Sequence, residues 1–170
     1  SRTAALTKEL AAYLQSLGLK PGDRVAIMMP NLLQYVIAMY ACLRAGYIVV
    51  NINPLYTSRE VNGTLRDSEA KAIIIIENFA KTLQNALPGT KCEHIITTAV
   101  GDLFPFFKRT LVNFVVRKVK KMVPEYSLPN AVGFNEALEI GRRHGFTAHE
   151  IHNTDIAFLQ YTGCLLYTSD

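Results

Sequence analysis

The chain has 170 residues, of which 49% are hydrophobic and 19% are charged, so the composition excludes a disordered chain and suffices for one globular unit with its own core. The formal net charge is +4 and the pI is about 9.0. This mild basicity favours anionic partners without choosing among nucleotides, nucleic acids and acidic lipids.

The first third of the chain alternates between helical and strand patterns. Apolar residues from Leu6 to Leu17 recur at helical spacing, and Gly18 follows as a C-terminal cap. The run "RVAIMM" over 24–29 predicts a buried strand. We expect Asn31 to cap the next helix, which Gly46 terminates in a left-handed conformation.

The same alternation continues after the second helix. "YIVVNI" predicts a strand, and Thr57 and Glu60 have the spacing of a capping box at the start of another helix. "KAIIII" and "HIITTAV" are further strands on either side of a short helix over 79–87, and "DIAFLQY" over 155–161 is a late strand. "GRRHG" is interpreted as a helix end.

Apolar strands that alternate with helices predict an α/β fold with a mostly parallel, doubly wound sheet and right-handed crossovers. Ligands of such sheets bind beyond the carboxyl ends of the strands, which directs attention to the loop after Tyr161. No G-x-G-x-x-G follows any strand, which argues against a dinucleotide-binding oxidoreductase domain.

Residues 103–124 differ from the rest of the chain because they are basic and contain no acid. At about 100° per residue, one stripe collects the apolar residues Phe104, Phe107, Leu111, Val115, Val119 and Met122, and the opposite side collects Arg109, Arg117 and Lys120. One interpretation is a helix lying in an anionic membrane interface. The alternative function that goes with it is a noncatalytic α/β module that docks on the membrane surface. The other interpretation is a surface helix packed on its own domain, and nucleic acid is a weaker third choice because no binding motif accompanies the charge.

The cysteines and histidines do not indicate a metal site. Cys42, Cys92 and Cys164 are odd in number and widely spaced, so they suggest no disulfide framework either. No signal peptide pattern opens the chain, and no apolar run approaches the roughly 20 residues of a spanning helix. We therefore expect a cytoplasmic protein, with peripheral contact to the inner face of the cell membrane as an option.

Three stretches together carry a family resemblance. They are the run from about Leu17 to Phe79, which contains "PGDRVAIMMPN", and the later segments "MVPEYSLPNAVGFNEAL" and "NTDIAFLQYTG". In combination they resemble adenylate-forming enzymes, most of all the bacterial long-chain fatty acid:CoA ligases. The resemblance implies that residues 1–163 are a partial N-terminal AMP-binding domain, with the basic segment 103–124 inserted in it.

In that family the late strand leads into a loop of the form Tyr-Thr-Gly-Gly-Thr-Thr-Gly that holds ATP phosphates. Only Tyr161, Thr162 and Gly163 match, and the resemblance implies that they begin this loop. Glycine lets the backbone approach phosphate oxygens closely, whereas the following "CLLYTSD" is apolar. We predict that residues 164–170 are foreign sequence from a frame slip or an assembly end; the alternative is a natural relative with a remodelled loop.

The resemblance also implies the chemistry of the parent enzyme. Such a ligase activates a fatty acid with ATP and Mg²⁺ and transfers the acyl group to coenzyme A. The family's catalytic and metal-binding residues lie beyond residue 170, so we assign no catalytic residue and no metal ligand to this chain. We expect no nucleic acid partner, and we expect this polypeptide alone to be inactive.

Overall fold

A computed structural model describes residues 2–161 and shows a six-stranded sheet with the order β5-β4-β3-β1-β2-β6. Every strand pairing in it is parallel, which confirms the predicted α/β, doubly wound class. The strands are β1 (Arg24–Met28), β2 (Ile48–Asn51), β3 (Ala72–Ile76), β4 (His94–Thr98), β5 (Ala131–Gly133) and β6 (Phe158–Gln160).

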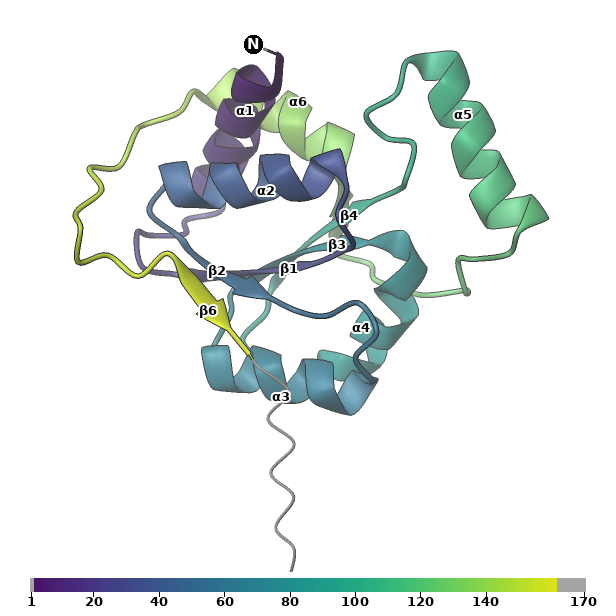
Figure 1. Ribbon diagram of the computed structural model, residues 1–170, viewed down its shortest axis with the longest axis horizontal. Coiled ribbons are helices and arrows are strands. Elements are labelled where there is room, and N and C mark those ends of the chain that lie inside the picture. Colours follow the sequence, from purple (N-terminus) through teal and green to yellow (C-terminus); the bar gives the residue numbers. More distant parts are fainter. Residues whose placement is uncertain (1, 162–170) are drawn as a thin grey trace, which may run out of the picture.

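Helices cover both faces of the sheet. They are α1 (Arg2–Ser16), α2 (Leu33–Arg44), α3 (Ser58–Ser68), α4 (Ala80–Ala86), α5 (Phe106–Phe114) and α6 (Phe134–His144), with a 3₁₀ turn η1 (Glu77–Phe79) and a π-helical turn η2 (Val115–Val119). In Figure 1, α1, α2 and α6 lie on one face, α3 and α4 lie on the other, and α5 stands to one side of the sheet.

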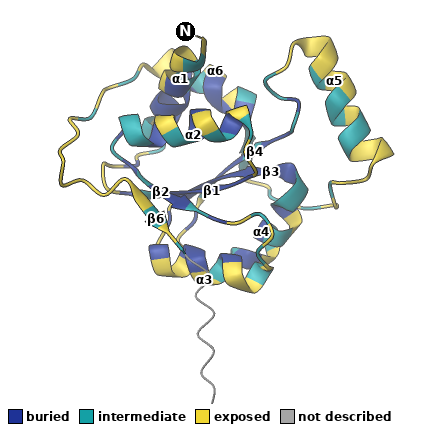
Figure 2. Ribbon diagram, viewed as in Figure 1, coloured by how far each residue is buried: buried dark blue, intermediate teal, exposed yellow. Residues whose placement is uncertain are grey.

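The apolar strands follow from this layering. All five residues of β3 are buried, since each side chain meets a helix whichever face it points to. Two clusters of buried side chains result, one on each face, and β1 and β3 contribute to both. Figure 2 shows the buried residues concentrated in the central strands and in the helix faces that contact them.

The helix ends match the predictions with one exception. Thr57 and Glu60 form the expected capping box at the start of α3, and Gly18 and Gly46 have positive φ just after α1 and α2. The predicted cap at Asn31 is wrong, because α2 begins one residue later than expected and its N-cap is Leu32, which has no side-chain hydrogen bond there. Asn31 instead lines a cavity described below.

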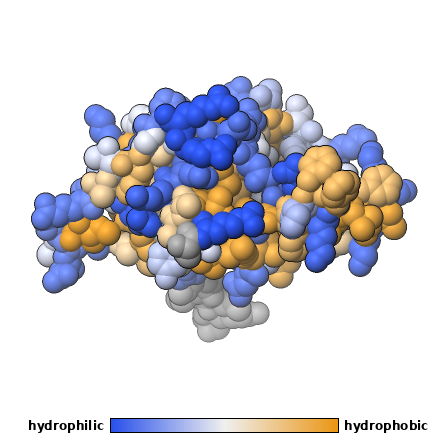
Figure 3. Space-filling model, turned by 90° about the horizontal axis from the view of Figure 1, so that it is seen from above, coloured by the Kyte–Doolittle hydropathy of each residue, from blue (hydrophilic) through white to orange (hydrophobic). Residues whose placement is uncertain are grey.

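Two elements differ from the sequence prediction. Strand β5 was not expected, because Ala131–Gly133 is too short to give an apolar run; it forms because its backbone pairs with β4 at the sheet edge. The basic segment is helical over α5 and η2, but no residue of either is buried. Within residues 2–161 its apolar stripe does not pack on the domain, since Phe107 is 85% and Leu111 is 63% exposed. Figure 3 shows large hydrophobic side chains at the surface on the side of the molecule where α5 lies in Figure 1.

Candidate functional site

A cavity of about 380 Å³ lies at the carboxyl ends of β1, β2 and β6. The chain leaves β1 toward α2 on one face of the sheet and leaves β2 toward α3 on the other, so the two connections diverge and open a crevice between them (Figure 1). Ten residues line it: Ile27, Met29, Asn31, Tyr35, Asn51, Ile52, Asn53, Tyr56, Gln160 and Tyr161.

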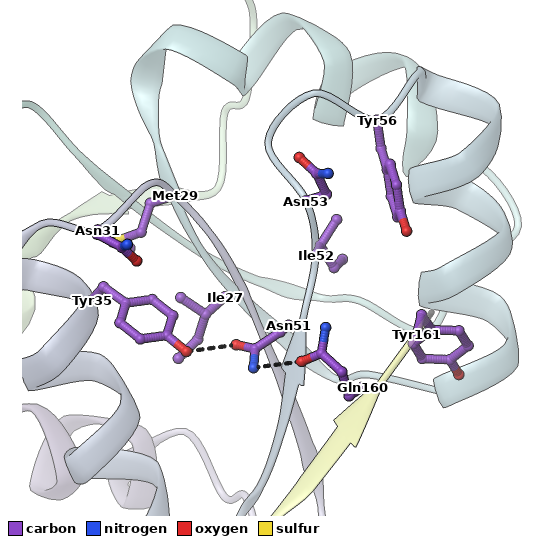
Figure 4. A pocket seen from close by; sticks show the side chains of 10 residues that line it. All are labelled: Ile27, Met29, Asn31, Tyr35, Asn51, Ile52, Asn53, Tyr56, Gln160 and Tyr161. Atoms are coloured by element: carbon purple, nitrogen blue, oxygen red, sulfur yellow. Dashed lines mark hydrogen bonds between the residues drawn. The ribbon is translucent and has the colours of Figure 1, made fainter. Parts of the chain in front are cut away.

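A short hydrogen-bonded chain of side chains crosses one wall of the cavity (Figure 4). The Tyr35 hydroxyl of α2 donates to Oδ1 of Asn51 at 3.0 Å, and Nδ2 of Asn51 donates to Oε1 of Gln160 at 3.0 Å. The chain therefore links a helix to the ends of two neighbouring strands. Because each amide orientation is fixed by its neighbour, this wall presents polar groups in a defined arrangement.

Asn53 forms the turn that follows β2. Its side-chain Oδ1 accepts a hydrogen bond from the backbone N–H of Leu55 at 2.9 Å, and its carbonyl accepts one from the N–H of Tyr56 at 3.0 Å. These bonds give the turn the local side-chain to backbone support that is typical of asparagine. Asn53 thus holds the rim of the cavity in place.

Tyr161 follows β6 at the edge of the cavity, and its side chain is anchored to α3. Its hydroxyl donates to Oδ2 of Asp67 at 2.6 Å. Partial burial, followed by this hydrogen bond and the Asp67 charge, raises the pKa of Tyr161 to about 12, so the phenol stays protonated at neutral pH. Thr162 and Gly163, the other two predicted phosphate-loop residues, lie outside the described residues.

Residues 2–161 contain no group of three or more His, Cys, Asp or Glu side chains that could hold a metal ion. Within the same range, no helix combines the length and apolar character needed to cross a membrane. Cys42 and Cys92 are both free and buried, and burial raises the pKa of each thiol to about 12.

Sequence reasoning found Tyr161 but missed the wall formed by Tyr35, Asn51 and Gln160. The positions of Asn51 and Gln160 in their strands could have indicated this wall. Asn51 is a polar residue near the end of an apolar strand, and Gln160 holds the equivalent place in the late strand, directly opposite it in the parallel register. Tyr35 lies on a helix, and only its close approach to Asn51 identifies it.

The sequence profile described as "AMP-binding enzyme" matches residues 1–164, which is nearly the whole chain. The chain belongs to the AMP-binding enzyme family. Its cavity at the carboxyl ends of the strands therefore lies in the part of an AMP-binding enzyme that this profile describes.

Curated relatives are similar over a comparable range. A long-chain-fatty-acid–CoA ligase of Haemophilus influenzae is 55% identical over 158 residues, which are 92% of this chain and 28% of that protein. A ligase of the same name from Bacillus subtilis is 37% identical over 156 residues, with 91% and 28% covered. The chain thus spans a little over a quarter of the length of these relatives.

Solved structures share the fold. A crystal structure of a long-chain-fatty-acid–CoA ligase from Archaeoglobus fulgidus matches with a TM-score of 0.69 at 24% identity, covering 95% of this chain and 27% of that one. An anthranilate CoA ligase crystallised with anthranoyl-AMP matches with a TM-score of 0.68 at 21% identity, covering 94% and 26%. At these identities the likeness establishes the architecture.

Proposed function

We propose that the complete protein carrying this sequence is a long-chain fatty acid:CoA ligase that uses ATP, Mg²⁺ and coenzyme A. The observation that carries the proposal is the 55% identity over 158 residues to the Haemophilus influenzae ligase, together with the match of the AMP-binding profile. The fold is compatible, since parallel sheets of this kind bind ligands beyond the carboxyl ends of their strands.

The proposed reaction has two steps. A carboxylate oxygen of the fatty acid attacks the α-phosphorus of ATP, the bond to pyrophosphate breaks, and an acyl-adenylate forms. The thiol of coenzyme A, acting as a thiolate, then attacks the acyl carbon, and AMP leaves. Negative charge builds up on phosphate oxygens in the first step, so donors that are already in position stabilise it most effectively.

In this chain we assign the start of the ATP phosphate loop to Tyr161, Thr162 and Gly163. The described geometry supports the assignment at its first residue. Tyr161 follows β6 beside a polar wall, and the bond from its hydroxyl to Asp67 anchors its side chain to α3.

Mg²⁺ would neutralise phosphate charge during the reaction. Residues 2–161 offer no cluster of carboxylates for it, so we assign no residue of this chain to the metal and place its ligands elsewhere in the complete protein. For the same reason we propose that the 170-residue polypeptide alone forms no acyl-CoA.

The test is a product assay with the complete protein, palmitate, ATP, Mg²⁺ and coenzyme A. Acyl-CoA and AMP should form in equal amounts, and omission of the fatty acid should abolish both. Gly163→Val should lower kcat/KM for ATP at least on the order of a hundredfold because its side chain blocks the backbone's approach to phosphate. Gly63→Ala, on an exposed face of α3, serves as the control. AMP release that does not depend on fatty acid would contradict the proposal.

Two further proposals concern the sequence itself. We place the protein in the cytoplasm, which the two buried free thiols support, and cell fractionation tests this. We also propose that residues 164–170 are not native sequence. The profile match ends at residue 164, which supports the proposal. Resequencing the source DNA across this point tests it, and in-frame ligase-like codons after "CLLYTS" would refute it.

A further inference from the structure

Strand β6 directly precedes the residues that we assign to the ATP phosphate loop, and apolar packing holds it only weakly. None of its three residues is buried, and Phe158 is 40% exposed. Within the described part of the chain it is an edge strand whose one partner is β2. Elements with few buried contacts open locally at a low cost in free energy. The position of the end of β6 therefore depends on contacts other than apolar packing.

One such contact joins the end of β6 to α2. Gln160 lies opposite Asn51 in the parallel register, so both side chains point to the same face of the sheet. Nδ2 of Asn51 donates to Oε1 of Gln160, and Oδ1 of Asn51 accepts from the hydroxyl of Tyr35, each at 3.0 Å (Figure 4). Tyr35 lies in the first turn of α2. Gln160 is thus connected to a helix through one intermediate side chain.

A second contact joins the next residue to the opposite face of the sheet. Successive side chains of an extended chain alternate between faces, so Tyr161 points away from the side of Gln160. It packs against the buried cluster to which α3 contributes, and its hydroxyl donates to Oδ2 of Asp67, in the last turn of α3, at 2.6 Å. In Figure 1, α2 and α3 lie on opposite faces. Two neighbouring residues therefore bind helices on the two faces of the sheet.

This two-sided arrangement restrains the strand end more than either contact alone. A single bond leaves the end of β6 able to swing toward one face, whereas bonds to both faces oppose each other. The contacts contribute little to the core, since Gln160 and Asp67 are exposed. Hydrogen bonds at positions open to water add little to the free energy of folding. Their main effect is therefore on where the end of β6 lies.

We propose that Tyr35, Asn51 and Asp67 are positioning residues for the ATP phosphate loop and that they act through Gln160 and Tyr161. The proposal rests on the part of the proposed function that assigns the start of the loop to Tyr161. A segment that is held in place before ATP arrives loses less conformational freedom on binding, so both contacts should raise the affinity for ATP. They should also help to orient ATP for attack by the fatty acid carboxylate.

Asp67 provides a test with a conservative control. Asp67→Ala removes the acceptor of the Tyr161 hydroxyl, whereas Asp67→Asn keeps an oxygen that can accept the same bond. Both variants remove the negative charge, so any general electrostatic effect on ATP is the same in both. In the complete protein, Asp67→Ala should weaken ATP binding about tenfold, and Asp67→Asn should restore most of the affinity.

Tyr35 provides the matching test on the other face of the sheet. Tyr35→Phe removes the hydroxyl that orients Asn51 and keeps the ring. It should weaken ATP binding about fivefold. The control is Tyr40→Phe on the same helix, whose side chain is 50% exposed and has no hydrogen bond among the described residues. The variant with both Tyr35→Phe and Asp67→Ala should bind ATP more weakly than either single variant.

Two measurements on the complete protein separate positioning from a general loss of stability. Calorimetric titration with ATP and Mg²⁺, without fatty acid, gives the Kd for ATP, and steady-state kinetics with palmitate gives the KM of each substrate. The Kd and KM for ATP should rise, while the KM values for palmitate and coenzyme A stay within about twofold of the wild type. A variant that only unfolds in part lowers kcat with its folded fraction and leaves every KM unchanged.

Three results would overturn the proposal. The first is equal affinity for ATP in Asp67→Ala and Asp67→Asn. The second is equal affinity in Tyr35→Phe and Tyr40→Phe. The third is a wild-type protein that binds no ATP. Failure of the ligase function gives a different result, since the wild type would then bind ATP, the variants would differ as expected, and no acyl-CoA would form from palmitate.

Discussion

The packing of α6 on α1 depends on the absence of a side chain at Gly141. A Cβ built there would lie 1.8 Å from the carbonyl oxygen of Glu9 and 2.9 Å from the backbone nitrogen of Tyr13. Real Cβ contacts are essentially never shorter than 3.0 Å, so in Gly141→Ala the two helices must separate by more than an ångström. The obstacle is backbone, so no side-chain rotation relieves it.

Two opposing effects set the expected change in the free energy of unfolding of Gly141→Ala. Overpacking of this kind costs up to about 3 kcal/mol, and the better helix propensity of alanine returns about 1 kcal/mol. The net destabilisation of about 2 kcal/mol should lower the melting temperature by roughly 4–8 °C for a domain of this size. Thermal unfolding followed by circular dichroism measures the shift.

Gly63 provides the matched control. It lies in the exposed interior of α3, where a Cβ would meet nothing within 4 Å. Gly63→Ala should therefore raise stability by about 1 kcal/mol, since only the propensity effect remains. If Gly141→Ala melted at or above the wild-type temperature, the close approach of α1 and α6 would be wrong.

Three other predictions follow from local contacts. Thr57→Ala removes the capping box of α3 and should cost about 1 kcal/mol at neutral pH. Hydrogen bonds from the backbone and side chain of Thr57 lower the pKa of Glu60 below its ordinary value of 4.5. The capping box therefore stabilises the folded protein fully above pH 4.5, and this contribution is lost as the pH falls through the lowered pKa of Glu60. Denaturation curves of the wild type and of Thr57→Ala should converge in acid. Burial raises the thiol pKa of Cys42 and Cys92 to about 12, so iodoacetamide should leave both unmodified in the native protein and label them after denaturation, as peptide mass spectrometry would show. Arg117→Ala removes the ion pair that joins η2 to the buried carboxylate of Glu77, so trypsin should cleave within 103–124 faster than in the wild type. Unchanged cleavage would mean that this ion pair does not hold the segment.

The core of the fold was predictable because the local sequence pattern of each core element favours the structure that the element adopts. β3 contains four consecutive isoleucines, so both of its faces must be covered to keep apolar side chains from water. The spacing of Thr57 and Glu60 directly predicts the capping box of α3. β5 was not predictable, since its three residues become a strand only by pairing with β4. That pairing joins residues such as Ile96 and Val132, which are distant in the sequence.

The candidate site was predictable only in its location. The rule that ligands bind beyond the strand ends led to the loop after Tyr161, and Tyr161 itself lines the cavity. The wall of Tyr35, Asn51 and Gln160 combines one helix and two strands, and no local pattern joins them. Periodicity likewise revealed the apolar stripe of 103–124 but not the direction that it faces, since Arg117 finds Glu77 forty residues away in the sequence.

The strand-end cavity and the loop that leads from β4 toward α5 share a support in the first turn of α2. Gln34 in the first turn of α2 is 2% exposed, and its Nε2 donates to the carbonyls of Ala99 and Val100, at 3.1 and 3.4 Å, in the loop that follows β4. The next residue is Tyr35, which begins the polar wall of the cavity. Because the sheet is parallel, the ends of β1, β2, β4 and β6 meet at one edge, so the cavity and the segment that begins after β4 belong to the same side of the molecule.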